Sequence, residues 1–135
     1  MKRTRQTIDL RAALGGELLK LENPARYLGG EFGQTRKYPD QADFVMGIAF
    51  PDSYEIGMSN NAIKLIYALA NRLQGVACER AFTPHPDCEA LLRERGLLLA
   101  TLESGIILRD LDILGFSIGF ELSITNALTM LDLGG

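Results

Sequence analysis

The chain has 135 residues, of which 47% are hydrophobic, and a formal net charge of −3. This length and apolar content predict one folded domain with a hydrophobic core, and the weakly acidic balance excludes the concentrated positive surface that nucleic-acid phosphates require. Asp112 interrupts the best apolar stretch, so no segment approaches the roughly 20 residues that cross a bilayer. Asp9 and Arg11 stand where a secretory signal would need apolar residues. We therefore expect a cytoplasmic protein without a membrane or nucleic-acid partner.

The first 42 residues form a lead-in with weak structural signals. Apolar residues in 7–22 follow helical spacing, but Gly15 and Gly16 interrupt the pattern, which predicts one broken helix or two short ones. Residues 23–41 combine two prolines with three glycines and show no periodicity, as is typical of a loop. The compact domain is therefore expected to span residues 43–135.

That domain alternates between strand and helix patterns. Residues 44–50 are apolar throughout, which suits a strand covered on both faces, and from Ser59, a candidate N-cap, apolar residues recur at helical spacing as far as Gly75. The order predicts an α/β domain, Rossmann-like or flavodoxin-like, whose mainly parallel sheet of about four strands is flanked by helices. Because the order ends on a helix, we expect this domain to be incomplete at its C-terminal end. The other expected elements are strands at 76–83, 97–102 and 112–120 and helices at 86–96 and 123–134, the last capped by Ser123.

Polar residues follow each expected strand. In open parallel sheets, ligands bind beyond the carboxyl ends of the strands, where loops open into a crevice. The serines could instead cap helices, and the carboxylates could be exposed loop residues. If the residues surround a ligand, the cofactor-binding site consists of Asp52, Ser53, Tyr54, Glu55, Gly57, Ser59, Thr83, Glu103, Ser104 and Glu121.

Motifs for metal binding and catalysis are missing from the sequence. His85 is the only histidine, and together with Cys78 and Cys88 it supplies too few ligands for a closed zinc site. No P-loop, Ser-His-Asp arrangement or paired-carboxylate motif emerges. We expect neither a metal site nor catalysis by this chain alone.

Several blocks of the sequence, at matching separations, resemble one family. It is the N-terminal, cobalamin-binding-type region of radical S-adenosylmethionine proteins, and the resemblance runs from about Glu22 to Gly135. It implies that a radical domain follows, where a Cys-x3-Cys-x2-Cys motif ligates an iron-sulfur cluster and S-adenosylmethionine binds. This chain has no such motif. The blocks are ENPARYLGGEFG, FPDSYEIGMSNNAIKLIYALAN, CERAFTPHPDCEALLRERG, LESG and DILGFSIGFELSITNALTMLDLGG.

The resemblance also raises the question of cobalamin. Cobalamin domains of the mutase type use an Asp-x-His-x-x-Gly loop whose histidine ligates cobalt. Asp52 and Gly57 match its ends, but Tyr54 stands in the place of the histidine. A phenol is a poor substitute for imidazole on cobalt, so the resemblance implies either cobalamin held without a protein ligand or a domain that has lost the cofactor.

The resulting hypothesis is an accessory domain of a radical S-adenosylmethionine enzyme that performs no catalysis itself. The alternative is a docking or substrate-presenting module that has lost cofactor binding. The expected partner is the downstream radical domain. Because an incomplete sheet leaves an open edge, we also expect the chain to self-associate.

Overall fold

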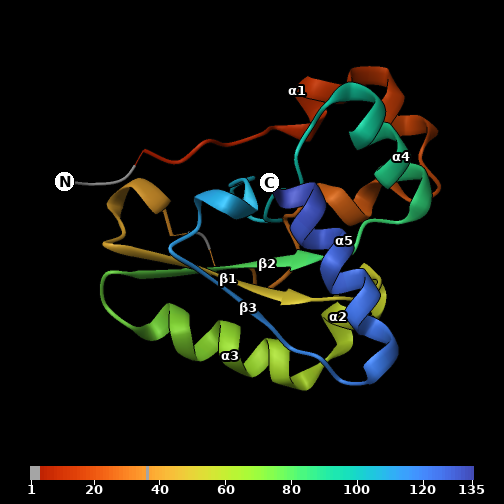
Figure 1. Ribbon diagram of the computed structural model, residues 1–135. Coiled ribbons are helices and arrows are strands. Elements are labelled where there is room, and N and C mark those ends of the chain that lie inside the picture. The colour runs from red at the N-terminus through yellow and green to blue at the C-terminus, as the bar shows by residue number, and fades with distance from the viewer. Residues whose placement is uncertain (1–3, 36) are drawn as a thin grey trace.

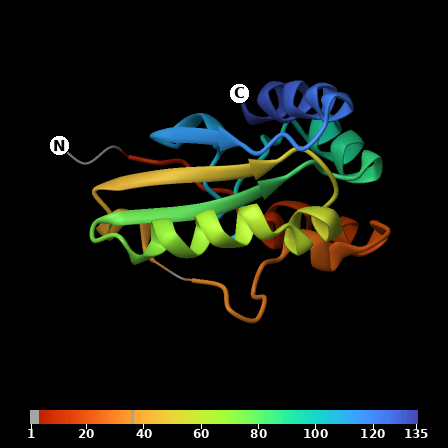
Figure 2. The same cartoon turned by 90° about the horizontal axis from the view of Figure 1, so that it is seen from below.

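The computed structural model describes residues 4–35 and 37–135. Its centre is a parallel sheet of three strands, β1 (Phe44–Phe50), β2 (Val76–Phe82) and β3 (Ile113–Phe116), in the order β2-β1-β3. Figure 2 shows the strands side by side, with β3 in blue at the edge opposite β2 in green. The predicted α/β class is confirmed, with three strands in place of about four.

Helices cover both faces of this sheet (Figure 1). On one face, α3 (Asn61–Arg72) buries Ile63 and Tyr67 against Ile48 and Phe50 of β1. The other face packs against α1 (Leu10–Leu14), α4 (Pro86–Arg95) and α5 (Ile124–Gly134), while α2 (Tyr54–Ser59) follows β1 directly. Among the residues that the structure describes, no helix has the length and apolarity to cross a membrane.

The expected strand at 97–102 is wrong. Ala100 forms only an isolated antiparallel bridge with Ile107, and the backbone N–H of Leu99 bonds to α5, at the carbonyl of Leu133 (2.8 Å). Gly105, with φ of 70°, reverses the chain between the two halves of this bridge. The backbone of this segment bonds mainly to the bridge and to α5, so it is not a strand of the sheet. The apolar run is buried for another reason, since it fills the space between β2 and α5.

The helix after Ser59, the strand at 112–120 and both expected serine caps also differ from expectation. The helix expected from Ser59 begins at Asn61, because Asn60 provides the cap by accepting the N–H of Ile63 at 3.1 Å. The hydroxyls of Ser59 and Ser123 donate instead to carbonyls three residues before them. The strand expected at 112–120 is shorter, because only Ile113–Phe116 pairs with β1.

The described part of the lead-in packs on the sheet. In it, α1 is followed by a 3-10 helix at Gly15–Lys20. Leu14, Leu18 and Leu21 lie in the same core as Val45 of β1. Burial of these side chains stabilises a segment whose local signals are weak.

Candidate functional site

A cavity of about 270 Å³ opens at the carboxyl ends of β1 and β2. The lead-in, α2, α4 and α5 all contribute to its wall. Of the ten predicted site residues, three line it: Ser53 and Tyr54 after β1, and Thr83 after β2. The Oγ1 atom of Thr83 is buried and has no hydrogen-bond partner among the described residues. A molecule in this cavity could therefore bond to that hydroxyl.

Charged side chains around the cavity are paired with one another. Arg26 donates to Glu55 at 2.6 Å, and His85 lies 3.0 Å from Asp87. Most of the remaining wall is apolar, with Phe82, Leu92 and Leu99 among its members. The cavity is thus suited to an uncharged group, because neither of these contacts has to be broken to admit one.

Other predicted site residues have structural contacts. The carboxylate of Asp52 accepts the N–H of Ser53 at 2.7 Å, and its carbonyl accepts the N–H of Thr83 at 3.1 Å, so Asp52 links the ends of β1 and β2. Gly57 packs on the ring of Phe82, where an added Cβ would lie 2.2 Å from the nearest ring carbon. Ser59 closes α2, and Glu121 is exposed at the start of the turn before α5, so neither lines the cavity.

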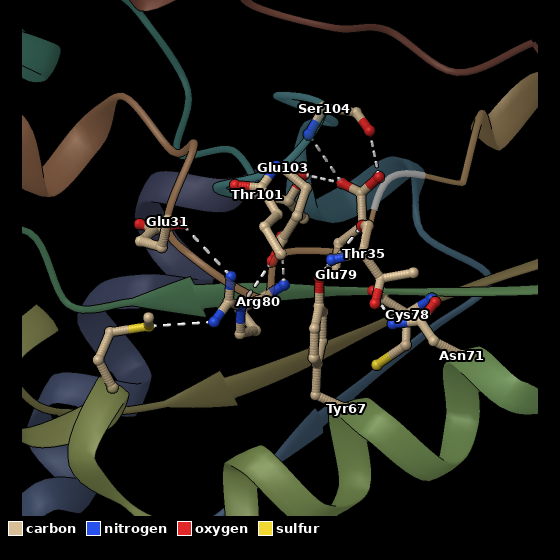
Figure 3. A network of polar contacts seen from close by, with 12 residues as sticks. Glu31, Thr35, Tyr67, Asn71, Cys78, Glu79, Arg80, Thr101, Glu103 and Ser104 are labelled. Atoms are coloured by element: carbon tan, nitrogen blue, oxygen red, sulfur yellow. Dashed lines mark hydrogen bonds and ion pairs between the residues drawn. The ribbon is translucent and has the colours of Figure 1, made fainter.

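Glu103 belongs to a second, buried cluster around Arg80 of β2 (Figure 3). The guanidinium of Arg80 donates to Glu103 at 2.6 Å, approaches Glu31 of the lead-in at 3.5 Å, and lies 4.4 Å above the ring of Tyr67. The backbone N–H of Arg80 donates to the other carboxylate oxygen of Glu103 at 2.7 Å. These contacts join the lead-in, α3 and the outer edge of β2.

Ser104 contacts a different carboxylate. Glu79 points to the opposite face of β2 from Arg80, is 2% exposed, and accepts hydrogen bonds from Thr101 and Ser104. Our sequence analysis missed Glu31, Glu79 and Arg80. The sequence did contain a signal for Glu79 and Arg80. They are adjacent opposite charges inside the otherwise apolar strand VACERAF, and such charges require partners when they are buried.

The pKa of Glu103 makes the stability of the fold depend on pH. Burial raises this pKa from 4.5 to about 7, although Arg80 opposes the shift. Between those values the folded state binds more protons than the unfolded state, so the free energy of unfolding should fall as the pH rises from about 4.5 to about 7. Urea titrations of the wild type and Glu103→Gln across this range test it. A wild-type slope equal to that of the variant would contradict it.

Tyr54 does not fit the role of a cobalt ligand. Its hydroxyl donates to Glu31 at 2.8 Å, and its ring meets Phe82 edge-on at 5.7 Å between centroids. Burial, reinforced by Glu31, raises the pKa of Tyr54 to about 12, so the phenol stays protonated at neutral pH. The cavity volume of about 270 Å³ is also below the range of about 300–1,000 Å³ for small-molecule pockets, and a corrin macrocycle is larger than most such ligands. These residues therefore do not fit a cobalamin coordinated by the chain.

Fold and site together define an α/β domain with a parallel sheet, a small cavity at the strand ends and a buried polar cluster on the edge strand. Residues 62–135, more than half of the chain, match a protein-family model described as "Radical SAM proteins, N-terminal". The chain belongs to this family. No curated protein and no solved structure matches it.

Proposed function

We propose that the chain is an accessory domain that docks onto the radical SAM domain of its protein. The observation that carries this proposal is an apolar surface on α5 and the turn before it. Its side chains are between 48% and 79% exposed. We call it the α5 surface, and it consists of Phe120, Leu122, Ile124, Leu128 and Leu131.

Helix geometry gathers these side chains on one side. Ile124, Leu128 and Leu131 are separated by four and three residues, so they project from the same side of α5. The opposite side of α5 is already in the core, through Met130 and Leu133. An exposed group of this kind marks a surface that another protein covers, because water contact with each large apolar side chain is unfavourable.

Family membership supports the radical SAM domain as the partner. The matched region is described as N-terminal in radical SAM proteins, and it includes the whole α5 surface. A role without catalysis of its own is supported by the cysteine content, because Cys78 and Cys88 are the only cysteines and a three-cysteine cluster motif needs one more. Both thiols are buried, and burial raises their pKa values, which disfavours the thiolate that a cluster requires.

Binding of the separately produced radical SAM domain tests the proposal. Isothermal calorimetry should detect association with the wild-type chain, and Leu128→Glu should weaken it by about tenfold or more because a carboxylate would lie in the apolar contact. Leu19→Glu is the control, since Leu19 is 78% exposed in the 3-10 helix of the lead-in and is not part of the α5 surface. Absence of binding, or equal effects of the two variants, would overturn the proposal.

The isolated chain should also self-associate. Without its partner, the α5 surface is free to pair with a second copy, which removes the same side chains from water. Light scattering over a wide concentration range should show a mass that rises above that of the monomer, and Leu128→Glu should reduce the rise. A strictly monomeric wild type at every concentration would contradict this expectation.

A second candidate function is ligand binding in the strand-end cavity. The observation in its favour is the unpartnered Thr83 hydroxyl in the cavity wall. Hydroxocobalamin is the first probe, and we expect the chain not to retain it after gel filtration, as judged by its visible absorbance. Retention that Thr83→Val abolishes would favour a cobalamin domain over a docking domain.

A further inference from the structure

The face of the sheet that packs on α3 is only partly covered. Its core combines α3 with residues of β1 and β2 and, among the described residues, includes none of β3. Figure 2 shows α3 alongside β2, while β1 and β3 lie clear of it. Parallel sheets occur almost only where helices cover both faces, so the part of this face at β1 and β3 is expected to have a further cover.

Two large apolar side chains mark the uncovered part. Met46 of β1 packs against the core under α3, and it pairs with Ile113 of β3, so Ile113 points to the same face. Phe44 lies two residues before Met46 and also points there. Phe44 is 41% exposed and Ile113 is 52% exposed.

α3 has a second apolar side besides the one in the core. Leu65, Leu69 and its C-cap residue Leu73 are spaced by four residues, so they form one ridge, and Ile66 lies beside this ridge. These side chains are between 37% and 60% exposed. We call them the α3 strip.

The α3 strip lies on the side of the helix toward β1 and β3. Asn71 bonds to the backbone of Cys78 at the outer edge of β2, so its side of α3 turns toward that edge (Figure 3). Leu69 and Leu73 are each two residues from Asn71, about 200° round the helix, and therefore project from the opposite side. The α3 strip and the exposed side chains of β1 and β3 thus belong to one apolar surface.

The charges of α3 indicate what kind of partner covers this surface. α3 contains Lys64 and Arg72 and no acidic residue. Both cations are exposed, in the ridge next to that of Leu65 and Leu69, and neither has an ion-pair partner within residues 4–35 and 37–135. A second copy of the chain would bring like charges together, which is unfavourable, whereas acidic side chains would be attracted.

This apolar surface continues round the edge of the sheet to the α5 surface. β3 is an edge strand among the described residues. From β3 the chain runs through Ile118, which is 49% exposed, to Phe120 of the α5 surface. A partner that docks on the α5 surface and extends past β3 therefore contacts both regions.

We propose that the radical SAM domain places an amphipathic helix beside α3, with its apolar side on the α3 strip and acidic residues facing Lys64 and Arg72. The inference rests on the proposed docking function and names a second contact of the same interface. A helix fits this position because its ridges pack between those of α3, and because helices are the usual cover of a parallel sheet.

A substitution in the centre of the α3 strip tests the apolar contact. Leu69→Glu should weaken binding of the radical SAM domain by about tenfold or more in calorimetry, and Leu19→Glu, the control, should bind within about twofold of the wild type. Leu69 is 50% exposed, and urea unfolding of the variant should match that of the wild type. Equal binding of the two variants, with binding still weakened in Leu128→Glu, would overturn the helix beside α3 and leave the docking function intact. Absence of any binding would overturn both.

A charge reversal tests the acidic character of the partner helix. Arg72→Glu should weaken binding by about fivefold at about 0.05 M salt, and the loss should shrink at about 0.5 M because salt screens exposed charges. Arg11→Glu is the matched control, since Arg11 is also an exposed arginine in the last turn of a helix, α1. Binding of Arg72→Glu equal to that of Arg11→Glu at low salt would overturn the acidic helix.

Methyl NMR of the unmodified chain provides a readout that does not depend on how any variant folds. The signals of Leu65, Leu69 and Ile113 should shift when the radical SAM domain is added, while that of Leu19 should stay in place. Shifts of the first three signals when the isolated chain is concentrated would assign the α3 strip to a second copy and overturn the proposal.

Discussion

Replacing Arg80 by alanine should lower the free energy of unfolding by about 3–5 kcal/mol, the usual cost of removing one partner of a buried ion pair. The side chain of Glu103 is only 2% exposed and would lose its counter-charge. The contact between the guanidinium and the Tyr67 ring would be lost as well. Urea unfolding at pH 8, above the raised pKa of Glu103, measures the effect.

A matched control separates this buried cluster from ordinary surface pairs. Arg93 also pairs with two carboxylates, Glu89 at 3.0 Å and Asp132 at 2.8 Å, but it is exposed to solvent. Arg93→Ala should change stability little, because exposed pairs are screened by water and salt. Equal effects of the two substitutions would contradict the structural role given to Arg80.

Replacing Asn71 by alanine should cost about 2–4 kcal/mol, because two buried backbone groups would each lose a partner. Asn71 is 8% exposed and bonds both the N–H and the carbonyl of Cys78. The substitution should also open the edge of β2. Amide exchange at Cys78 is the second measurement, and it should become faster in the variant.

Asn61→Ala is the control for this substitution. Asn61 lies in the same helix, α3, but is exposed, and it should tolerate alanine with little change in stability. A small effect of Asn71→Ala with unchanged exchange at Cys78 would show that the edge of β2 does not depend on this side chain.

Sequence patterns predicted the class of the fold because its central elements have strong local signals. The run FVMGIAF is apolar at every position, as a strand buried on both faces requires, and it forms β1. Pro86 and Gly96 mark the two ends of α4, where Gly96 adopts φ of 62°. Such signals depend on a few neighbouring residues, so they can be recognised without knowledge of the rest of the chain.

The errors come from interactions between distant residues. LLLATL has the composition of a buried strand, yet its burial arises from packing between β2 and α5, which no local pattern reveals. For the same reason, the predicted site residues lie in two separate places in the structure. Tyr54 contacts the cavity, whereas Glu103 contacts Arg80, and both connect to Glu31 of the lead-in through tertiary contacts.

Tyr54 illustrates how the structure changes a functional interpretation. By sequence it occupies the place of a metal ligand, which directs attention to cofactor binding. In the structure it is a partly buried phenol that contacts the lead-in through Glu31 and packs on Phe82. Tyr54 therefore has a role in stability, and the proposed functional surface lies on α5 and the turn before it.

Methyl NMR of the chain with and without the radical SAM domain tests this account most directly. Docking predicts that the methyl signals of Ile124, Leu128 and Leu131 on the α5 surface shift when the domain is added. Signals of Leu92 and Leu99 in the wall of the strand-end cavity should stay in place. Shifts confined to these two cavity leucines would contradict the account.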